Sequence, residues 1–94
     1  MGEIVAAERI EGSEKLLKLK INIGDEDRQI LSGIAKSHIP EDLIGKKVVI
    51  IANLDPRMMM GHESQGMLLA AHGADESPVL LLPAGDVPPG AKIS

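Results

Sequence analysis

The chain has 94 residues, of which 44% are hydrophobic and 26% charged, and its formal net charge is −4. This size and composition are typical of one folded domain and exclude a disordered chain. The absence of cysteine excludes disulfides, thiolate zinc sites and cysteine nucleophiles. No apolar run is long enough to span a membrane and the N-terminus lacks the features of a signal peptide, so we expect one cytoplasmic domain over residues 1–94.

The first half of the chain predicts three strands. Residues 3–10, "EIVAAERI", are expected to form the first strand. Residues 17–23 alternate apolar and polar side chains, which is the period-2 pattern of a half-buried strand. The "GDED" segment at 24–27 predicts a hairpin turn, because glycine and aspartate tolerate the backbone angles that such turns need. The next strand is therefore expected over residues 28–35.

A short helix is predicted next, in the segment "IPEDLIGKK" at residues 39–47. Pro40 suits a first helical position, acidic residues follow it, and Gly45 comes after the last apolar residue. Residues 47–54 are typical of a strand buried on both faces, and two more strands are expected within residues 66–71 and 77–83.

Together these elements predict an all-β fold: five or six short strands with one short helix after the third. A parallel α/β sheet would need a helix between every pair of strands, so a five-stranded OB-fold barrel is the natural candidate. Residues 84–94 are rich in glycine and proline and predict a short C-terminal extension.

The segment "GHESQG" at residues 61–66 raises the possibility of a serine hydrolase. A nucleophile elbow requires glycine two residues before the serine, and His62 stands there before Ser64. We therefore predict no catalytic residue and a polar loop between strands. The histidines at 38, 62 and 72 lack metal-ligand spacing, so no metal site and no cofactor are predicted.

Charge and side-chain types leave two interpretations open. The overall negative charge argues against binding nucleic acid through bulk positive charge, yet residues 15–22 hold three lysines and no acid. On spacing alone these lysines form the solvated face of a strand, and a phosphate-binding stripe is the alternative. The methionines at 58–60 indicate core or hairpin packing rather than a ligand surface. Without aromatic residues the chain cannot stack bases on rings, so any nucleic acid would be recognised by shape and backbone.

Four segments in order carry a resemblance to a known family: "AERIEGSEKLLKLKINIGDE", "RQILSGIAK", "PEDLIGKKVVIIANLDPR" and "MGHESQGMLLAA". They resemble the tRNA-binding domain found at the C-terminus of methionyl-tRNA synthetases and as free-standing, structure-specific tRNA-binding proteins. The resemblance runs from about Ile4 to Ser94. It implies an OB fold with short additions after the barrel, assembled as a homodimer that binds the outside corner of tRNA.

The resemblance also implies contact residues. By motif, tRNA contacts fall on Lys15, Ser64 and Met67, and by position Asn53 and Arg57 join them. Charge and predicted exposure alone add three electrostatic candidates: Lys18, Lys20 and Lys36. Gly61 and Gly66 would let the loop approach the RNA, with residues 58–60 packing the hairpin that presents it.

Two features depart from the family. Residues 11–14, Glu-Gly-Ser-Glu, stand where many members have His-Pro-x-Ala-Asp. Members also carry further residues before "GEIV", which complete the first strand and contribute to the dimer, so the N-terminus is short relative to the family.

The leading hypothesis is a non-catalytic module that binds tRNA, as part of or beside a methionyl-tRNA synthetase. A protein-binding module like the export-related chaperones of the same fold family is the alternative, and a purely structural dimerisation domain is a second one.

Overall fold

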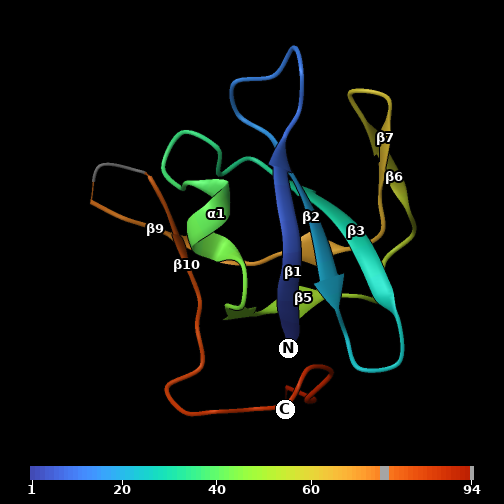
Figure 1. Cartoon of the computed structure of the whole chain (residues 1–94), viewed down its shortest axis with the longest axis vertical. Coiled ribbons are helices and arrows are strands. Elements are labelled where there is room, and N and C mark those ends of the chain that lie inside the picture. The colour runs from blue at the N-terminus through green and yellow to red at the C-terminus, as the bar shows by residue number, and fades with distance from the viewer. Residues whose placement is uncertain (75–76, 94) are drawn as a thin grey trace.

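The computed structural model describes residues 1–74 and 77–93, and within them the chain is mostly β (Figure 1). Asp75, Glu76 and Ser94, the last residue of the predicted extension, lie outside the described residues. The elements are β1 (Gly2–Arg9), β2 (Leu17–Asn22), β3 (Asp27–Ser32), α1 (Pro40–Leu43), β4 (Lys47–Val48), β5 (Ile50–Ile51), β6 (Arg57–Met59), β7 (His62–Ser64), β8 (Met67–Leu68), β9 (Ala70–His72) and β10 (Pro78–Leu80).

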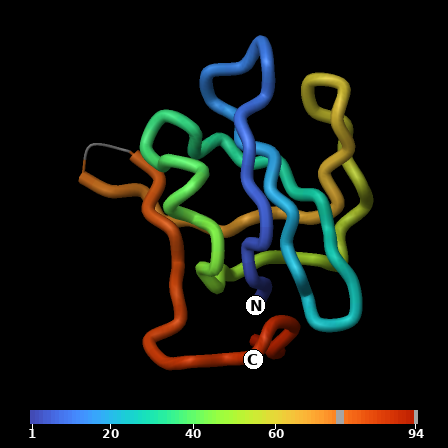
Figure 2. Tube along the Cα trace, in the orientation of Figure 1, coloured from blue at the N-terminus to red at the C-terminus, as the bar shows by residue number. Residues whose placement is uncertain are grey.

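The main sheet is antiparallel and has the order β3-β2-β1-β4. Its register pairs Leu17 with Arg9 on one side and with Ser32 on the other. The pairing of β1 with β2 shifts between Ile4 and Ala6, and such a bulge bends a strand and increases its twist. The sheet accordingly curls into half of a barrel (Figures 1 and 2).

The period-2 prediction for the second strand is confirmed. Leu17, Leu19 and Ile21 are fully buried, whereas Lys18 and Lys20 point to the other face. The inward side chains join a core drawn from most elements, because the curled sheet closes over them. That core consists of Ile4, Leu17, Leu19, Ile21, Ile30, Ile34, Ala35, Leu43, Val48 and Leu68.

The predicted turn and helix are also confirmed. Gly24 adopts a φ of 109° in the turn after β2, and Ile23 donates its N–H to the Glu26 carbonyl to close it. Helix α1 begins at Pro40, as expected for a residue with no N–H to donate, and ends before Gly45, whose φ is 91°. Leu43 anchors the helix in the core.

Four predicted strands are wrong in extent, and the last of them, predicted over residues 77–83, ends at Leu80. The run 47–54 is divided at Val49, since β4 pairs with β1 whereas β5 pairs with β8. The run 66–71 divides in the same way at Leu69, where β8 gives way to β9. The third strand ends at Ser32 instead of Ala35. Because each apolar run turns a corner between small sheets, the described residues hold ten short strands, and the predicted count of five is not confirmed.

The C-terminal extension returns to the start of the chain (Figure 2). The N-terminal ammonium of Met1 donates to the Ala91 carbonyl at 2.8 Å, and Gly90 donates its N–H to the Met1 carbonyl at 2.8 Å. A Cβ on Gly90 would overlap the carbonyl oxygen of Ile23, so only glycine allows this close approach. None of the helices in the described ranges is long and apolar enough to cross a membrane.

Candidate nucleic-acid interface

Ser64, a predicted contact residue, is buried with only 4% of its surface exposed. Its Oγ accepts a hydrogen bond from the Leu31 N–H at 3.1 Å and donates one to the Gly66 carbonyl at 3.0 Å. The hydroxyl therefore has a structural role, because it accepts a hydrogen bond from the buried Leu31 N–H on the edge of β3. The predicted contact of Ser64 with tRNA stays a prediction.

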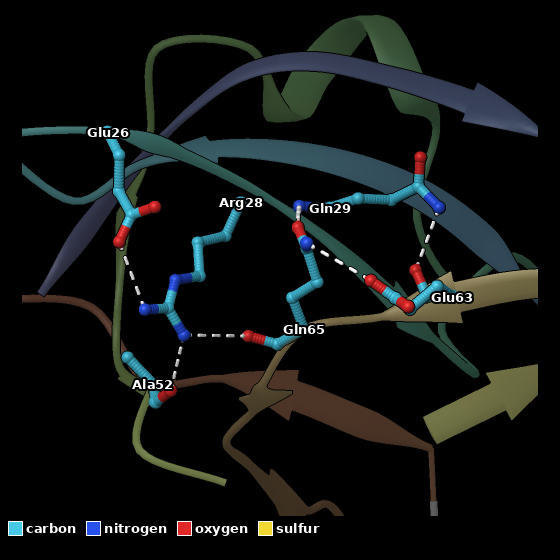
Figure 3. Close-up of polar contacts among 6 residues, drawn as sticks. All are labelled: Glu26, Arg28, Gln29, Ala52, Glu63 and Gln65. Carbon is cyan, nitrogen blue, oxygen red and sulfur yellow. Dashed lines mark hydrogen bonds and ion pairs between the residues drawn. The ribbon is translucent and has the colours of Figure 1, made fainter. Parts of the chain in front are cut away.

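Gln65 extends the same contact along β3 (Figure 3). Its Oε1 accepts the Gln29 N–H at 3.0 Å, and its own N–H donates to the Gln29 carbonyl at 2.7 Å. Gln29 Nε2 in turn donates to the Glu63 carbonyl at 2.8 Å. Two side-chain hydrogen bonds and one backbone hydrogen bond thus join β3 to β7 and to the residue after it. Gln65 lies within the segment "MGHESQGMLLAA" but was not predicted as important, because its partner Gln29 lies on a distant strand.

Arg28 joins three segments next to these hydrogen bonds (Figure 3). Its Nη1 donates to the carbonyls of Ala52 and Gln65, and its Nη2 lies 3.0 Å from Glu26 Oε1. The guanidinium can do this because it carries several N–H donors in one plane. Its role is structural, and no motif or periodicity in the sequence indicated it.

The hairpin β6–β7 presents the methionines. Met60 and Gly61 have φ angles of 50° and 80° at its tip, which is the pattern of a two-residue type I′ turn. Met58 and Met60 are 63% and 57% exposed, and Met59 is half-buried. The prediction that all three pack the hairpin is therefore wrong for Met58 and Met60. The hairpin is a narrow two-stranded ribbon, and no other part of the described chain covers these two side chains.

Three of the predicted contact residues meet in one cleft at the base of this hairpin. Arg57, Ser64 and Met67 line a cleft of about 320 Å³ together with the acidic Asp55 and with apolar and small residues of neighbouring segments. Met67 is 47% exposed and is one of the apolar residues that line the cleft. Asn53 is exposed in the loop between β5 and β6 but does not line the cleft.

The predicted lysines fall into two groups. Lys18 Nζ lies 2.6 Å from Glu8 Oε1, and Lys20 Nζ lies 3.9 Å from Asp27 Oδ2, so both sheet lysines face a carboxylate. The hydrogen bond from Lys18 and then its charge lower the pKa of Glu8. Lys15 and Lys36 are exposed in loops at the end of the barrel that also carries the hairpin β6–β7 (Figure 1).

No group of three or more histidine, aspartate and glutamate side chains gathers to hold a metal ion within residues 1–74 and 77–93. The described side chains at this end of the molecule are exposed cations and a cleft that is lined mostly by apolar and small residues and by one carboxylate, Asp55. Such a set can bind a ligand by charge and shape.

Comparison with known proteins finds relatives over nearly the whole chain. Residues 1–92 match the family model described as "Putative tRNA binding domain". The chain is 51% identical over 94 residues to a methionine–tRNA ligase of Caldanaerobacter subterraneus subsp. tengcongensis, and 52% identical over 93 residues to one of Archaeoglobus fulgidus. The match takes in 100% and 99% of this chain but only 15% and 14% of those two enzymes.

Two solved structures share the fold. A MetRS-related protein from Pyrococcus horikoshii superposes with a TM-score of 0.91 and 41% identity, covering 99% of this chain and 85% of that one. The chaperone CsaA from Bacillus anthracis superposes with a TM-score of 0.88 and 32% identity, covering 99% and 86%. The same architecture thus occurs in a protein named after a synthetase and in one named as a chaperone.

Proposed function

This chain belongs to the tRNA-binding domain family, and from that premise we propose that it binds tRNA in a structure-specific way. The domain is a non-catalytic module. It would act within or beside a methionyl-tRNA synthetase in the cytoplasm, raising the affinity of that enzyme for tRNA. An adenylating active site would lie in the part of such an enzyme that this chain does not span.

The observation that carries the proposal is the grouping of candidate residues at one end of the barrel (Figure 1). Arg57 and Met67 line the cleft, and Lys15 and Lys36 lie in loops at the same end. Arg57 has no carboxylate within 4 Å among the described residues, so its charge is available to a phosphate.

The proposed mechanism is recognition of shape and backbone. Cations neutralise phosphates, while Met67 and the cleft contact a sugar or base at the corner of the tRNA. The chain has no aromatic residue, so ring stacking contributes nothing. Ser64 supports this surface by holding the base of the hairpin against β3.

The OB fold and the homodimer belong to the same proposal. The meander β1-β2-β3, the helix that follows, and the divided runs β4–β5 and β8–β9 can be grouped as the five strands of an OB barrel. A dimer is favoured by exposed apolar side chains near α1 and β10, because such surfaces gain from being covered. These side chains are Ile39, Ile44, Val79, Leu81 and Leu82.

A protein-binding function is the second candidate, and a specific observation favours it. The cleft is lined by Leu54, Met59 and Met67, and flexible apolar side chains of this kind suit peptide binding. The similarity to CsaA, whose name makes it a chaperone, points in the same direction.

Titration at two salt concentrations separates the two functions. Binding of total tRNA should weaken by about 0.7–0.9 log units per phosphate contact for each tenfold rise in salt, and single-stranded RNA and duplex DNA should bind weakly. A peptide ligand should be nearly indifferent to salt. Met67→Ser should weaken tRNA binding without loss of stability, because the side chain is half exposed. Absence of tRNA binding at low salt by the folded chain would overturn the proposal.

A further inference from the structure

The cations of this chain differ sharply in whether a carboxylate neutralises them. Of the ten lysines and arginines, the four that form ion pairs lie on the sheet or beside it: Lys18, Lys20, Arg28 and Lys47. The others have no carboxylate within 4 Å in the described ranges: Arg9, Lys15, Lys36, Lys46, Arg57 and Lys92. An unpaired cation attracts phosphate more strongly, because no fixed negative charge competes for it.

The segments that carry three of the unpaired cations meet at a single residue, Ala35. Arg9 Nη1 donates to the Ala35 carbonyl at 3.3 Å, and the Ala35 N–H donates to the Lys15 carbonyl at 2.8 Å. Lys36 follows Ala35 directly in the chain. Ala35 is only 5% exposed, so the point at which these three segments meet is fixed in the core.

We propose that Arg9, Lys15 and Lys36 form one binding site for the phosphate backbone of RNA, and that Arg9 is a contact residue of this surface. The inference rests on the proposed function and assigns it a specific site. One Arg9 N–H is used by the Ala35 carbonyl, which orients the guanidinium and leaves its other donors for a phosphate. All three side chains are exposed, as a contact with RNA requires.

Two carboxylates oppose this site. Glu11 and Glu14 are exposed in the same loop as Lys15, and neither is within 4 Å of a cation in the described part of the chain. They repel an approaching phosphate and so limit the affinity of the site. Glu14→Gln should consequently strengthen tRNA binding, which a purely structural role for this loop would not predict.

The test is tRNA titration of the whole chain across a series of salt concentrations. Arg9→Gln and Lys36→Gln should each weaken binding about fivefold at low salt and reduce the salt slope by about 0.7–0.9. Arg9→Lys should keep the slope, because it keeps the charge. Lys46→Gln is the matched control: Lys46 is also exposed and unpaired, but its carbonyl bonds to Ile4 near the opposite end of β1.

The outcomes distinguish this inference from the function on which it rests. If the wild-type chain binds tRNA while Arg9→Gln and Lys36→Gln bind like Lys46→Gln, the inference is overturned and the proposed function stands. If Arg9→Gln weakens binding with an unchanged salt slope, Arg9 only positions the loop through Ala35, and its assignment as a contact is overturned. If the folded wild-type chain does not bind tRNA, the proposed function itself fails.

Discussion

The Oγ of Ser64 accepts the backbone N–H of Leu31 at a distance of 3.1 Å, and this one contact ties the base of the hairpin β6–β7 to the edge of the main sheet. Both residues are buried. Removal of the hydroxyl therefore leaves the Leu31 N–H without its partner in the fold.

Ser64→Ala should accordingly lower the free energy of unfolding by about 1–3 kcal/mol, the cost of leaving a buried donor unsatisfied. Denaturant unfolding measures the loss. Ser32→Ala is the control, because Ser32 is half-buried on β3 and its side chain makes no hydrogen bond within the described residues. A Ser64→Ala chain with unchanged stability and weakened tRNA binding would instead make Ser64 a direct contact.

Arg28 should contribute more to the free energy of unfolding than its ion pair with Glu26 alone would. Arg28→Gln removes the hydrogen bonds to the carbonyls of Ala52 and Gln65, which should cost about 1.5–3 kcal/mol because a charged donor is lost. Glu26→Gln removes only an exposed ion pair and should cost at most about 1 kcal/mol. Equal effects of the two substitutions in denaturant unfolding would contradict the assignment of a structural clamp to Arg28.

Glu8 should show a pKa below its ordinary value in an NMR titration of its carboxyl carbon, because Lys18 donates a hydrogen bond to it and lies close with a positive charge. Since the folded pKa is lower than the unfolded one, the pair stabilises the fold above the unfolded pKa, and this contribution is lost as pH falls through the folded pKa. Lys18→Met should raise the Glu8 pKa, whereas Lys20→Met should leave it low.

Gly90→Ala should destabilise the contact between the tail and the start of the chain. Gly90 has a φ of 85°, and an added Cβ would overlap the Ile23 carbonyl. The left-handed conformation alone costs about 1–2 kcal/mol for alanine, so thermal unfolding should shift by several degrees. Gly85→Ala is the matched control, because a Cβ there meets nothing within 4 Å. Identical melting temperatures would show that the tail contributes nothing to the stability of the barrel.

Where local pattern determines structure, the sequence was informative. The alternation from Leu17 to Ile21, the turn at Gly24 and the helix at Pro40 could all be predicted, because each depends on the chemistry of a few neighbouring residues. The division of the run 47–54 could not be predicted. It depends on which distant strands pair on either side of Val49, and no local pattern contains that information.

In the candidate site, too, features that depend on distant strands could not be predicted. Resemblance and residue type indicated Arg57, Ser64 and Met67, and the structure brings them to one cleft. The burial of Ser64 and the neutralisation of Lys18 could not be foreseen, because their partners Leu31 and Glu8 lie on other strands. The link between Arg9 and Ala35 could not be foreseen for a similar reason, since Ala35 lies beyond the end of another strand.

The hydrogen bonds that join Met1 to residues 90 and 91 also determine how this domain can be attached to a surface. They hold both ends of the described chain on the side of the barrel away from the hairpin β6–β7 and the loops of Lys15 and Lys36 (Figure 2). An amide at position 1 could still donate to the Ala91 carbonyl in place of the ammonium group. A surface attachment through either end would therefore leave the opposite pole of the molecule free in solution, so immobilised protein could be used directly for the RNA measurements.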